Sequence, residues 1–351
     1  MKQYILTFLA LLAIAGLLLS VACVSPAPPG EVTPPPTEEK PPEEVTPPSP
    51  TEEKPPEGVE PEPEELPSFP LTVVDDLGRE VEIEKLPQRI ISLAPSNTEI
   101  LFALGLEDRI VGVTQYCNYP EAARSKPRVA GYSAPDIEKV VSLEPDLVVA
   151  ESIHEKTVLS ALENVGLTVI VMSAKSLDTV LCDITLVGQI AGKSKAAAQL
   201  VDDLSDRIEA VTAETEGLTA EERLRVLYVC WHDPIWTLGS ETFIDDLIQK
   251  AGGINIFADD FKKSRVVSLE AVVTRNPQVI VVSGMGATRN LVYNSIKQEP
   301  RLSAVEAMVK GNVYQIDGDI LERPGPRIVD GLELVARFIH PEIFGMPETE
   351  S

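Results

Sequence analysis

The 351-residue chain is acidic: its formal net charge is −25, and 44% of its residues are hydrophobic. A surface of this charge repels phosphates, so the composition excludes the basic footprint of a nucleic-acid-binding protein. The length corresponds to about two domains.

The chain opens on an export signal. Lys2 precedes a nearly unbroken apolar run over residues 4–19, and small residues then lead to Cys23. This order is typical of a lipoprotein signal that is cut before the cysteine, which then carries lipid. We therefore predict removal of residues 1–22, lipidation of Cys23 and an extracytoplasmic protein anchored to the cell membrane. The alternative is a retained anchor helix, since the apolar run is nearly long enough to span a bilayer.

Residues 23–69 are predicted to be a disordered Pro/Glu-rich linker. Seventeen of the chain's thirty prolines lie in residues 26–70, interleaved with Glu and Thr. Such a segment buries no core and stays extended. We expect a spacer that reaches on the order of 100 Å.

Residues 70–175 alternate between strand and helix patterns, which predicts an N-terminal α/β lobe. Asp76-Leu77-Gly78 indicates a hairpin, and Ser96 followed by Glu99 is a capping box that opens a helix. The continuous apolar runs are typical of a parallel sheet covered on both faces. The predicted strands are 89–94, 109–114, 145–150 and 167–172, and two further helices are 135–143 and 155–165.

Residues 176–217 lack a strand signal and are predicted to be an inter-lobe helix region. Leu200, Leu204, Ile208 and Val211 repeat at helical spacing with charged residues between them. The sequence of residues 188–194 is similar to a phosphate-binding loop, but it is one residue shorter than that motif and follows a helix instead of a strand. We therefore interpret this segment as a break between two helices.

Residues 218–346 repeat the alternation and are predicted to be a C-terminal α/β lobe, followed by a tail at 347–351. Trp236 is assigned to a packed turn. The predicted strands are 225–231, 278–283 and 313–316, and the predicted helices are 241–251, 268–275, 301–309 and 326–339.

The two lobes carry the same short pattern. Residues 137–149 and 269–281 align without a gap, with Glu138 on Glu270 and Pro145 on Pro277, each a short helix followed by a buried strand. Two matched lobes favour a ligand cleft between them. The predicted fold class is α/β, with two Rossmann-like lobes joined by one long α-helix.

Catalytic and metal signals are weak. His154, His232 and His340 lie far apart, no Ser sits on a Gly-x-Ser-x-Gly turn, and no catalytic residue, metal site or catalytic cofactor is predicted. Besides Cys23, the chain has three cysteines, Cys117, Cys182 and Cys230. Three cysteines can form one disulfide at most.

Candidate ligand contacts lie where strands end, because ligands of open α/β sheets bind outside the carboxyl ends of the strands. Aromatic and polar side chains gather at these ends. The residues proposed on this ground are Ser96, Asn97, Tyr116, Tyr132 and Glu151 in the first lobe, and Trp231, His232, Asp319 and Arg323 in the second.

The core resembles a substrate-binding protein of an ABC importer, of the class with a helical inter-lobe backbone, and is most similar to the cobalamin-binding branch. The segments that carry this resemblance are "RIISLAPSNTEILFALGLEDRIVGVTQYCNYP", "IEKVVSLEPDLVVA", "GSETFIDDLIQKAGGINIF" and "ERPGPRIVDGLELVARFIHPE". It implies ligand contacts at Tyr116, Tyr132, Asp319 and Arg323.

The chain departs from this family at several cleft positions. The family often has Trp where this chain has Tyr132, Glu151 and Ser264, and Trp231 and His232 are expected to compensate. Aromatic side chains stack on a flat, mostly uncharged corrinoid, whereas an anionic ferric siderophore prefers several Arg or Lys.

The resemblance implies a lipoprotein that captures cobalamin or a related corrinoid and does no chemistry on it. A ferric siderophore or haem is the alternative ligand. An exported enzyme that uses His232 and Cys230 is the alternative of another class.

Glu138 and Glu270 each fall in the first turn of a matched helix. A carboxylate there is favourable at any helix N-terminus. The resemblance implies a second role for these two carboxylates: they dock the two lobes onto the permease dimer of the importer. The permease dimer works together with the ATPase subunits of the importer.

Overall fold

The computed structural model describes residues 66–129 and 131–346. The predicted signal segment, Cys23, most of the linker and the tail lie outside the described residues. Within the described part, none of the helices has the length and apolarity needed to cross a membrane.

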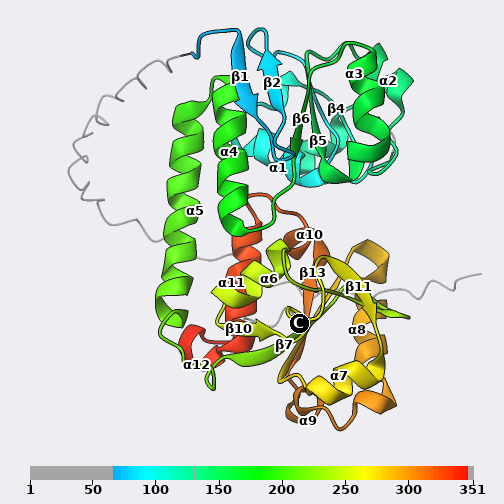
Figure 1. Ribbon diagram of the computed structural model, residues 1–351, viewed down its shortest axis with the longest axis vertical. Helices are drawn as coiled ribbons and strands as arrows, with labels where there is room; N and C mark the ends of the chain where they lie inside the picture. The colour runs from blue at the N-terminus through cyan, green and yellow to red at the C-terminus, as the bar shows by residue number, and fades with distance from the viewer. Residues whose placement is uncertain (1–65, 130, 347–351) are drawn as a thin grey trace, which may run out of the picture. The chain divides into compact units, whose positions relative to one another are not determined.

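The N-terminal lobe is built on a parallel sheet (Figure 1). The strand order is β4-β3-β5-β6, and a separate antiparallel hairpin, β1-β2, confirms the turn predicted around Gly78. The strands are β1 (Leu71–Val74), β2 (Glu80–Ile83), β3 (Ile90–Ser92), β4 (Ile110–Val113), β5 (Leu147–Glu151) and β6 (Val169–Met172). The helices are α1 (Pro95–Ala103), α2 (Ile137–Ser142) and α3 (Ser160–Asn164).

The C-terminal lobe has a second parallel sheet with the order β10-β7-β12-β13, and a small antiparallel sheet with the order β11-β9-β8. Its strands are β7 (Leu224–Val229), β8 (Trp231–His232), β9 (Ile235–Leu238), β10 (Gly253–Asn255), β11 (Ser264–Val267), β12 (Val279–Gly284) and β13 (Val313–Asp317). Its helices are α6 (Phe243–Lys250), α7 (Leu269–Arg275), α8 (Arg289–Lys297), α9 (Glu306–Lys310), α10 (Gly318–Leu321), α11 (Ile328–Ile339) and α12 (Pro341–Phe344).

The two parallel sheets have the same topology. In each, the first strand in sequence lies second in the sheet, next to the second strand on one side and the third on the other. The repeated segments occupy equivalent places, because α7 starts 132 residues after α2 and β12 starts 132 residues after β5. The two Rossmann-like lobes predicted from the repeat are confirmed.

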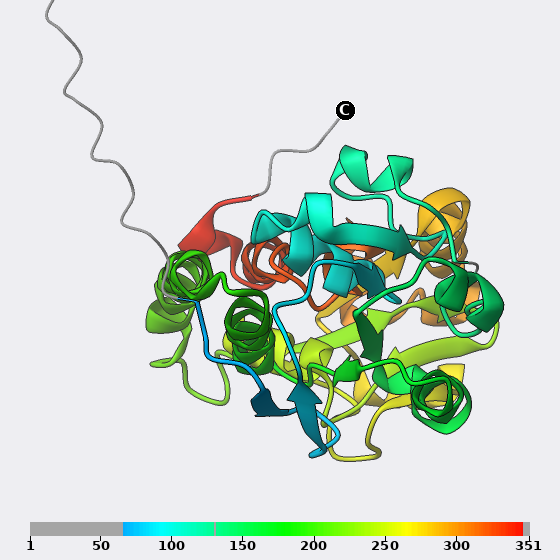
Figure 2. The same cartoon turned by 90° about the horizontal axis from the view of Figure 1, so that it is seen from above.

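The predicted inter-lobe helix is a pair of helices. α4 (Leu177–Ala191) ends at Gly192, whose φ of 66° suits glycine, and α5 (Ser194–Thr215) follows. The predicted helix break is therefore confirmed. With 22 residues α5 is about 33 Å long, and seen end-on it lies beside α4 (Figure 2).

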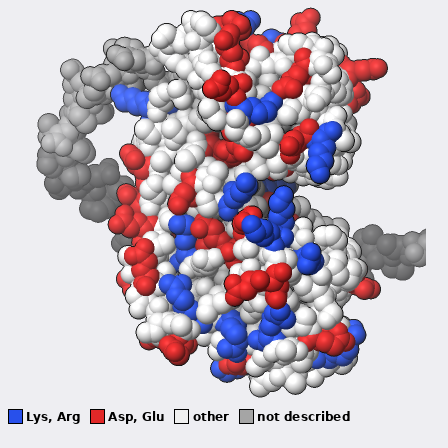
Figure 3. All heavy atoms as spheres, in the orientation of Figure 1, with Lys and Arg blue, Asp and Glu red and all other residues white. Residues whose placement is uncertain are grey.

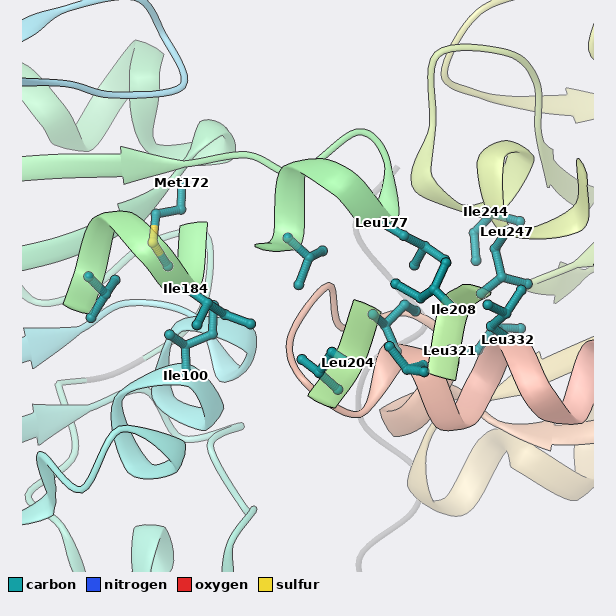
Figure 4. Packing of buried hydrophobic residues seen from close by; sticks show 14 of the residues in the cluster. Ile100, Met172, Leu177, Ile184, Leu204, Ile208, Ile244, Leu247, Leu321 and Leu332 are labelled. Atoms are coloured by element: carbon teal, nitrogen blue, oxygen red, sulfur yellow. The ribbon is translucent and has the colours of Figure 1, made fainter. Parts of the chain in front are cut away.

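One hydrophobic core runs through the helix pair from lobe to lobe. Figure 4 shows Ile100, Met172 and Ile184 from the N-terminal side of this core, with Leu177, Leu204, Ile208, Ile244, Leu247, Leu321 and Leu332 farther along it. The opposite face of each sheet has its own cluster. Val140 of α2 packs there in the N-terminal lobe, and Val272 of α7 packs there in the C-terminal lobe.

Three local predictions were wrong. α1 begins at Pro95 after Ala94 without a side-chain cap, because the Ser96 hydroxyl donates to Asn97 Oδ1 and Glu99 pairs elsewhere. Trp236 lies in strand β9, not in a turn. Helix α8 was missed, and the helix predicted over 301–309 is a short 3₁₀ turn followed by α9.

Candidate ligand-binding groove

The carboxyl ends of the two parallel sheets face each other. Segments that follow β3 and β4 contact segments that follow β13, and these contacts join residues more than 200 positions apart in sequence. Figure 3 shows the surface hollowed between the lobes, on the side away from α5. The candidate residues are therefore set around a groove between the lobes.

Ser96 and Asn97 stand at the start of α1 and are buried. The Asn97 amide donates to the carbonyls of Val149 (3.3 Å) and Ala150 (2.8 Å), which ties α1 to β5. These contacts give Asn97 a structural partner. Ligand contacts at both residues stay predictions.

Tyr132 and Glu151 form a hydrogen-bonded unit with His154. The Tyr132 hydroxyl donates to Glu151 Oε2 (2.9 Å), and burial, followed by the carboxylate charge, raises the pKa of Tyr132. His154 Nδ1 accepts from the Glu151 backbone N–H (3.0 Å), so Nε2 carries the proton and donates to the Tyr132 carbonyl (2.6 Å). The unit fixes the tyrosine ring. Sequence reasoning found Tyr132 and Glu151 but missed this role of His154.

Tyr116 and Trp231 are the exposed aromatic candidates. Tyr116 is 52% exposed after β4, and Trp231 is 37% exposed in β8. Trp231 pairs with Trp236 across the small sheet, and Trp236 pairs with Val266, so the three side chains form an exposed apolar row. The alternation of "IWTL" was the signal that would have placed Trp236 in a strand.

His232 follows Trp231 in β8, and the two rings are in contact, with their centroids 5.2 Å apart. It pairs with Ile235, which is buried in the core of the lobe. Its Nδ1 is buried and, within the described part of the chain, has no hydrogen-bond partner. Its predicted ligand contact stays a prediction.

Asp319 and Arg323 belong to an inter-lobe polar bridge, which we define as Glu99, Asn118, Asp319, Arg323 and Arg327. Arg323 is only 7% exposed and donates to Asp319 Oδ1 (2.6 Å) and to Asn118 Oδ1 (2.5 Å). The Asn118 amide in turn donates to Asp319 Oδ2 (2.8 Å). The C-terminal lobe thus holds a side chain of the N-terminal lobe between two opposite charges.

Glu99 and Arg327 form the second half of the bridge. The Arg327 guanidinium reaches both carboxylate oxygens of Glu99, at 2.6 and 2.9 Å, and its cation lies 3.8 Å from the Tyr119 ring centroid. Burial raises the pKa of Glu99, and the two arginines oppose that shift. Sequence reasoning missed Glu99, Asn118 and Arg327 as bridge residues, because no local pattern brings together positions so far apart.

Two pockets are formed by other residues. One of about 290 Å³ adjoins Tyr119 and Arg327, and one of about 540 Å³ lies on the C-terminal lobe beside Asp246 and Lys250. Neither is lined by a predicted ligand contact.

A family model described as periplasmic binding protein matches residues 90–320. The chain belongs to the periplasmic binding protein family. An uncharacterized ABC transporter substrate-binding lipoprotein of Bacillus subtilis is 32% identical over 79% of this chain and 87% of that protein. A cobalamin-binding protein of Halobacterium salinarum is 32% identical over 78% of this chain and 75% of its own.

Solved structures resemble this periplasmic binding protein over most of their length. The periplasmic vitamin B12 binding protein of Vibrio cholerae has a TM-score of 0.63 and 29% identity, covering 72% of this chain and 97% of that one. A periplasmic heme-binding protein in complex with two hemes has a TM-score of 0.65 and 25% identity, with the same coverage. The predicted class and fold are confirmed.

In this periplasmic binding protein, Glu138 and Glu270 occupy matched, exposed positions in α2 and α7. Both helices pack on the sheet face opposite the core that α4 and α5 share. Hydrogen bonds from its own backbone N–H and from Ser268 lower the pKa of Glu270. The two carboxylates therefore stand on equivalent outer faces of the two lobes.

Cys117, Cys182 and Cys230 are free thiols. Cys117 is fully buried against Thr98 and Thr114, whereas Cys182 is exposed on α4. Burial raises the pKa of Cys230 to about 12, which keeps it protonated and unreactive at neutral pH. This works against the alternative of an enzyme that uses Cys230 as a nucleophile.

Proposed function

We propose that this protein captures cobalamin or a related corrinoid outside the cell and delivers it to an ABC importer without changing it chemically. The observation that carries the proposal is an exposed aromatic side chain on each lobe, Tyr116 after β4 and Trp231 after β7. A corrinoid is a broad, flat ring, and aromatic faces on two sides suit it. The names of the relatives in Halobacterium and Vibrio agree with this ligand.

Cyanocobalamin is expected to bind the full chain in a one-to-one complex, measured by calorimetry. Tyr116→Ala and Trp231→Ala should each weaken binding about fivefold, because each removes a stacking surface worth about 1 kcal/mol. Val309→Ala is the control, since Val309 is 72% exposed on α9 and should leave affinity unchanged. Absence of binding to both cyanocobalamin and cobinamide would refute the proposal, and release of a chemically altered ligand would point to an enzyme.

Haem or a ferric siderophore is the second candidate, and one observation favours it. Lys262, Lys263 and Arg265 are exposed beside or within β11, and Figure 3 shows basic atoms gathered next to the hollow. Such charges attract anionic ligands. The same calorimetry with haemin and a ferric hydroxamate decides between the ligands. If either binds more tightly than cyanocobalamin, that compound and not a corrinoid is the ligand of this protein.

We further infer a lipid anchor at Cys23, outside the described residues, with the linker as its tether. The motif at residues 19–23 and the name of the Bacillus relative support this inference. Mass spectrometry of the mature N-terminus should find a diacylglyceryl group on Cys23, and Cys23→Ser should release the protein from membranes. An N-terminus that still begins with Met1 would mean a retained anchor helix instead.

A further inference from the structure

We propose that the Asn118 side chain is an internal competitor for a carboxamide-binding pair formed by Asp319 and Arg323. The inference rests on the proposed function and deepens it. It assigns to Asn118 the role of leaving the pair when a ligand amide enters.

The geometry at Asn118 is that of two-point amide recognition. Its Oδ1 accepts from Arg323 Nη1 (2.5 Å), and its Nδ2 donates to Asp319 Oδ2 (2.8 Å). The reverse orientation of the amide would set its oxygen against the carboxylate and its NH₂ against the guanidinium, so the assignment is unambiguous. Asp319 and Arg323 also pair with each other at 2.6 Å, which holds the acceptor and the donor side by side.

This donor–acceptor pair selects among ligand groups. A carboxylate would satisfy Arg323 but repel Asp319, and an ester would leave Asp319 without a donor. A primary amide satisfies both charges. A corrinoid carries several primary amide arms at its rim, whereas haem carries carboxylates, so the pair favours the corrinoid.

Asn118 is able to leave while its surroundings stay in place. The adjoining backbone is fixed, because Arg128 Nη1 donates to the carbonyls of Thr114 (2.7 Å) and Cys117 (2.9 Å), and Cys117 is buried. Rotation of the Asn118 side chain alone therefore frees the pair. The lobes remain joined by Arg327 and Glu99.

Removal of the Asn118 amide leaves no buried charge without a partner. Arg323 keeps Asp319 as its partner and has Glu99 at 3.7 Å. A side chain of the protein that a ligand must displace lowers the apparent affinity of the protein for that ligand, because the hydrogen bonds of the displaced side chain are lost when the ligand binds. Truncating it should therefore strengthen binding instead of weakening it.

The test is calorimetry on the full chain and on Asn118→Ala, with cyanocobalamin and with a corrinoid whose side chains are carboxylates. We expect Asn118→Ala to bind cyanocobalamin about tenfold more tightly and to keep the preference for the amide form. Asn164→Ala, an exposed asparagine on α3, is the matched control and should bind like the unmodified chain.

The possible failures are distinguishable. If the unmodified chain binds neither cyanocobalamin nor cobinamide, the proposed function fails and this inference with it. If it binds cyanocobalamin but Asn118→Ala binds equally or more weakly, Asn118 is no competitor although the function stands. Equal affinity of the unmodified chain for the carboxylate form overturns the amide selectivity.

An NMR measurement on the unmodified chain keeps the proposal testable if Asn118→Ala does not fold. The side-chain NH₂ signal of Asn118 in ¹⁵N-labelled protein should shift, and its hydrogen exchange should accelerate, on saturation with cyanocobalamin. An unchanged NH₂ signal in the saturated protein would show that the amide stays on Asp319 and Arg323, and the proposal would be wrong.

Discussion

Replacing Asp183 by Asn is expected to remove a stability loss of about 4 kcal/mol that the protein otherwise suffers between pH 5 and pH 8. Asp183 lies in α4, is 3% exposed and hydrogen bonds to Asp76 in the hairpin turn. Burial, reinforced by the charge of Asp76, raises the pKa of Asp183 to about 9. The folded protein thus holds a proton there at neutral pH.

The sign of the effect follows from proton binding. In the unfolded chain Asp183 has an ordinary pKa of about 3.9 and is ionised at pH 5. Above that value the folded state therefore binds one proton more than the unfolded state, and unfolding becomes more favourable as pH rises toward 9. The loss is about 1.4 kcal/mol per pH unit inside this window. An asparagine donates to Asp76 in the same way but has no proton to lose.

Urea denaturation at pH 5 and pH 8 measures this effect. Asp183→Asn should match the unmodified protein at pH 5 within about 1 kcal/mol and exceed it at pH 8. Asp178→Asn is the control on the same helix, because the Asp178 side chain is 75% exposed, and it should leave the pH dependence unchanged. Equal losses of stability in the Asp183→Asn variant and the unmodified protein would contradict the shared proton.

The repeat in the sequence correctly predicted the helix–strand unit that occurs once in each lobe. A short helix and an all-apolar strand, copied at one spacing, are local patterns, and α2–β5 and α7–β12 have the predicted bounds within two residues. Strand ends followed from the same pattern, so the segments that carry Tyr116 and Trp231 were found. Their side-chain contacts with a ligand stay predictions.

The failures share a physical cause, which is that tertiary contacts outweighed local signals. Ser96 and Glu99 have capping-box spacing, yet Glu99 is more strongly engaged by Arg327 from the other lobe. Helix α8 buries only Val292 and Ile296, too few apolar positions for a periodic pattern. The carboxamide of Asn118 has no local signature, since its partners come from positions 319 and 323.

Double replacement of Glu138 and Glu270 by Ala is expected to abolish stimulation of the importer ATPase while leaving ligand affinity intact. We propose that each carboxylate engages a basic site on one of two like permease subunits. Two equivalent lobes presented to two equivalent subunits give matched contacts. Val141 and Val273, each 40% exposed in the same two helices, would add apolar contact beside the charges.

The matched control is Asp203→Ala with Glu209→Ala, which removes two exposed carboxylates from α5 and changes the net charge equally. ATPase activity of the reconstituted importer, measured with saturating ligand-loaded protein, should fall to the basal rate for the Glu138/Glu270 variant only. Each single variant should keep part of the stimulation, because one lobe still docks. Full stimulation by the double variant would rule out docking through these carboxylates. An equal loss of ATPase stimulation in the α5 control would mean that the change in net charge, and not the position of the carboxylates, causes the loss.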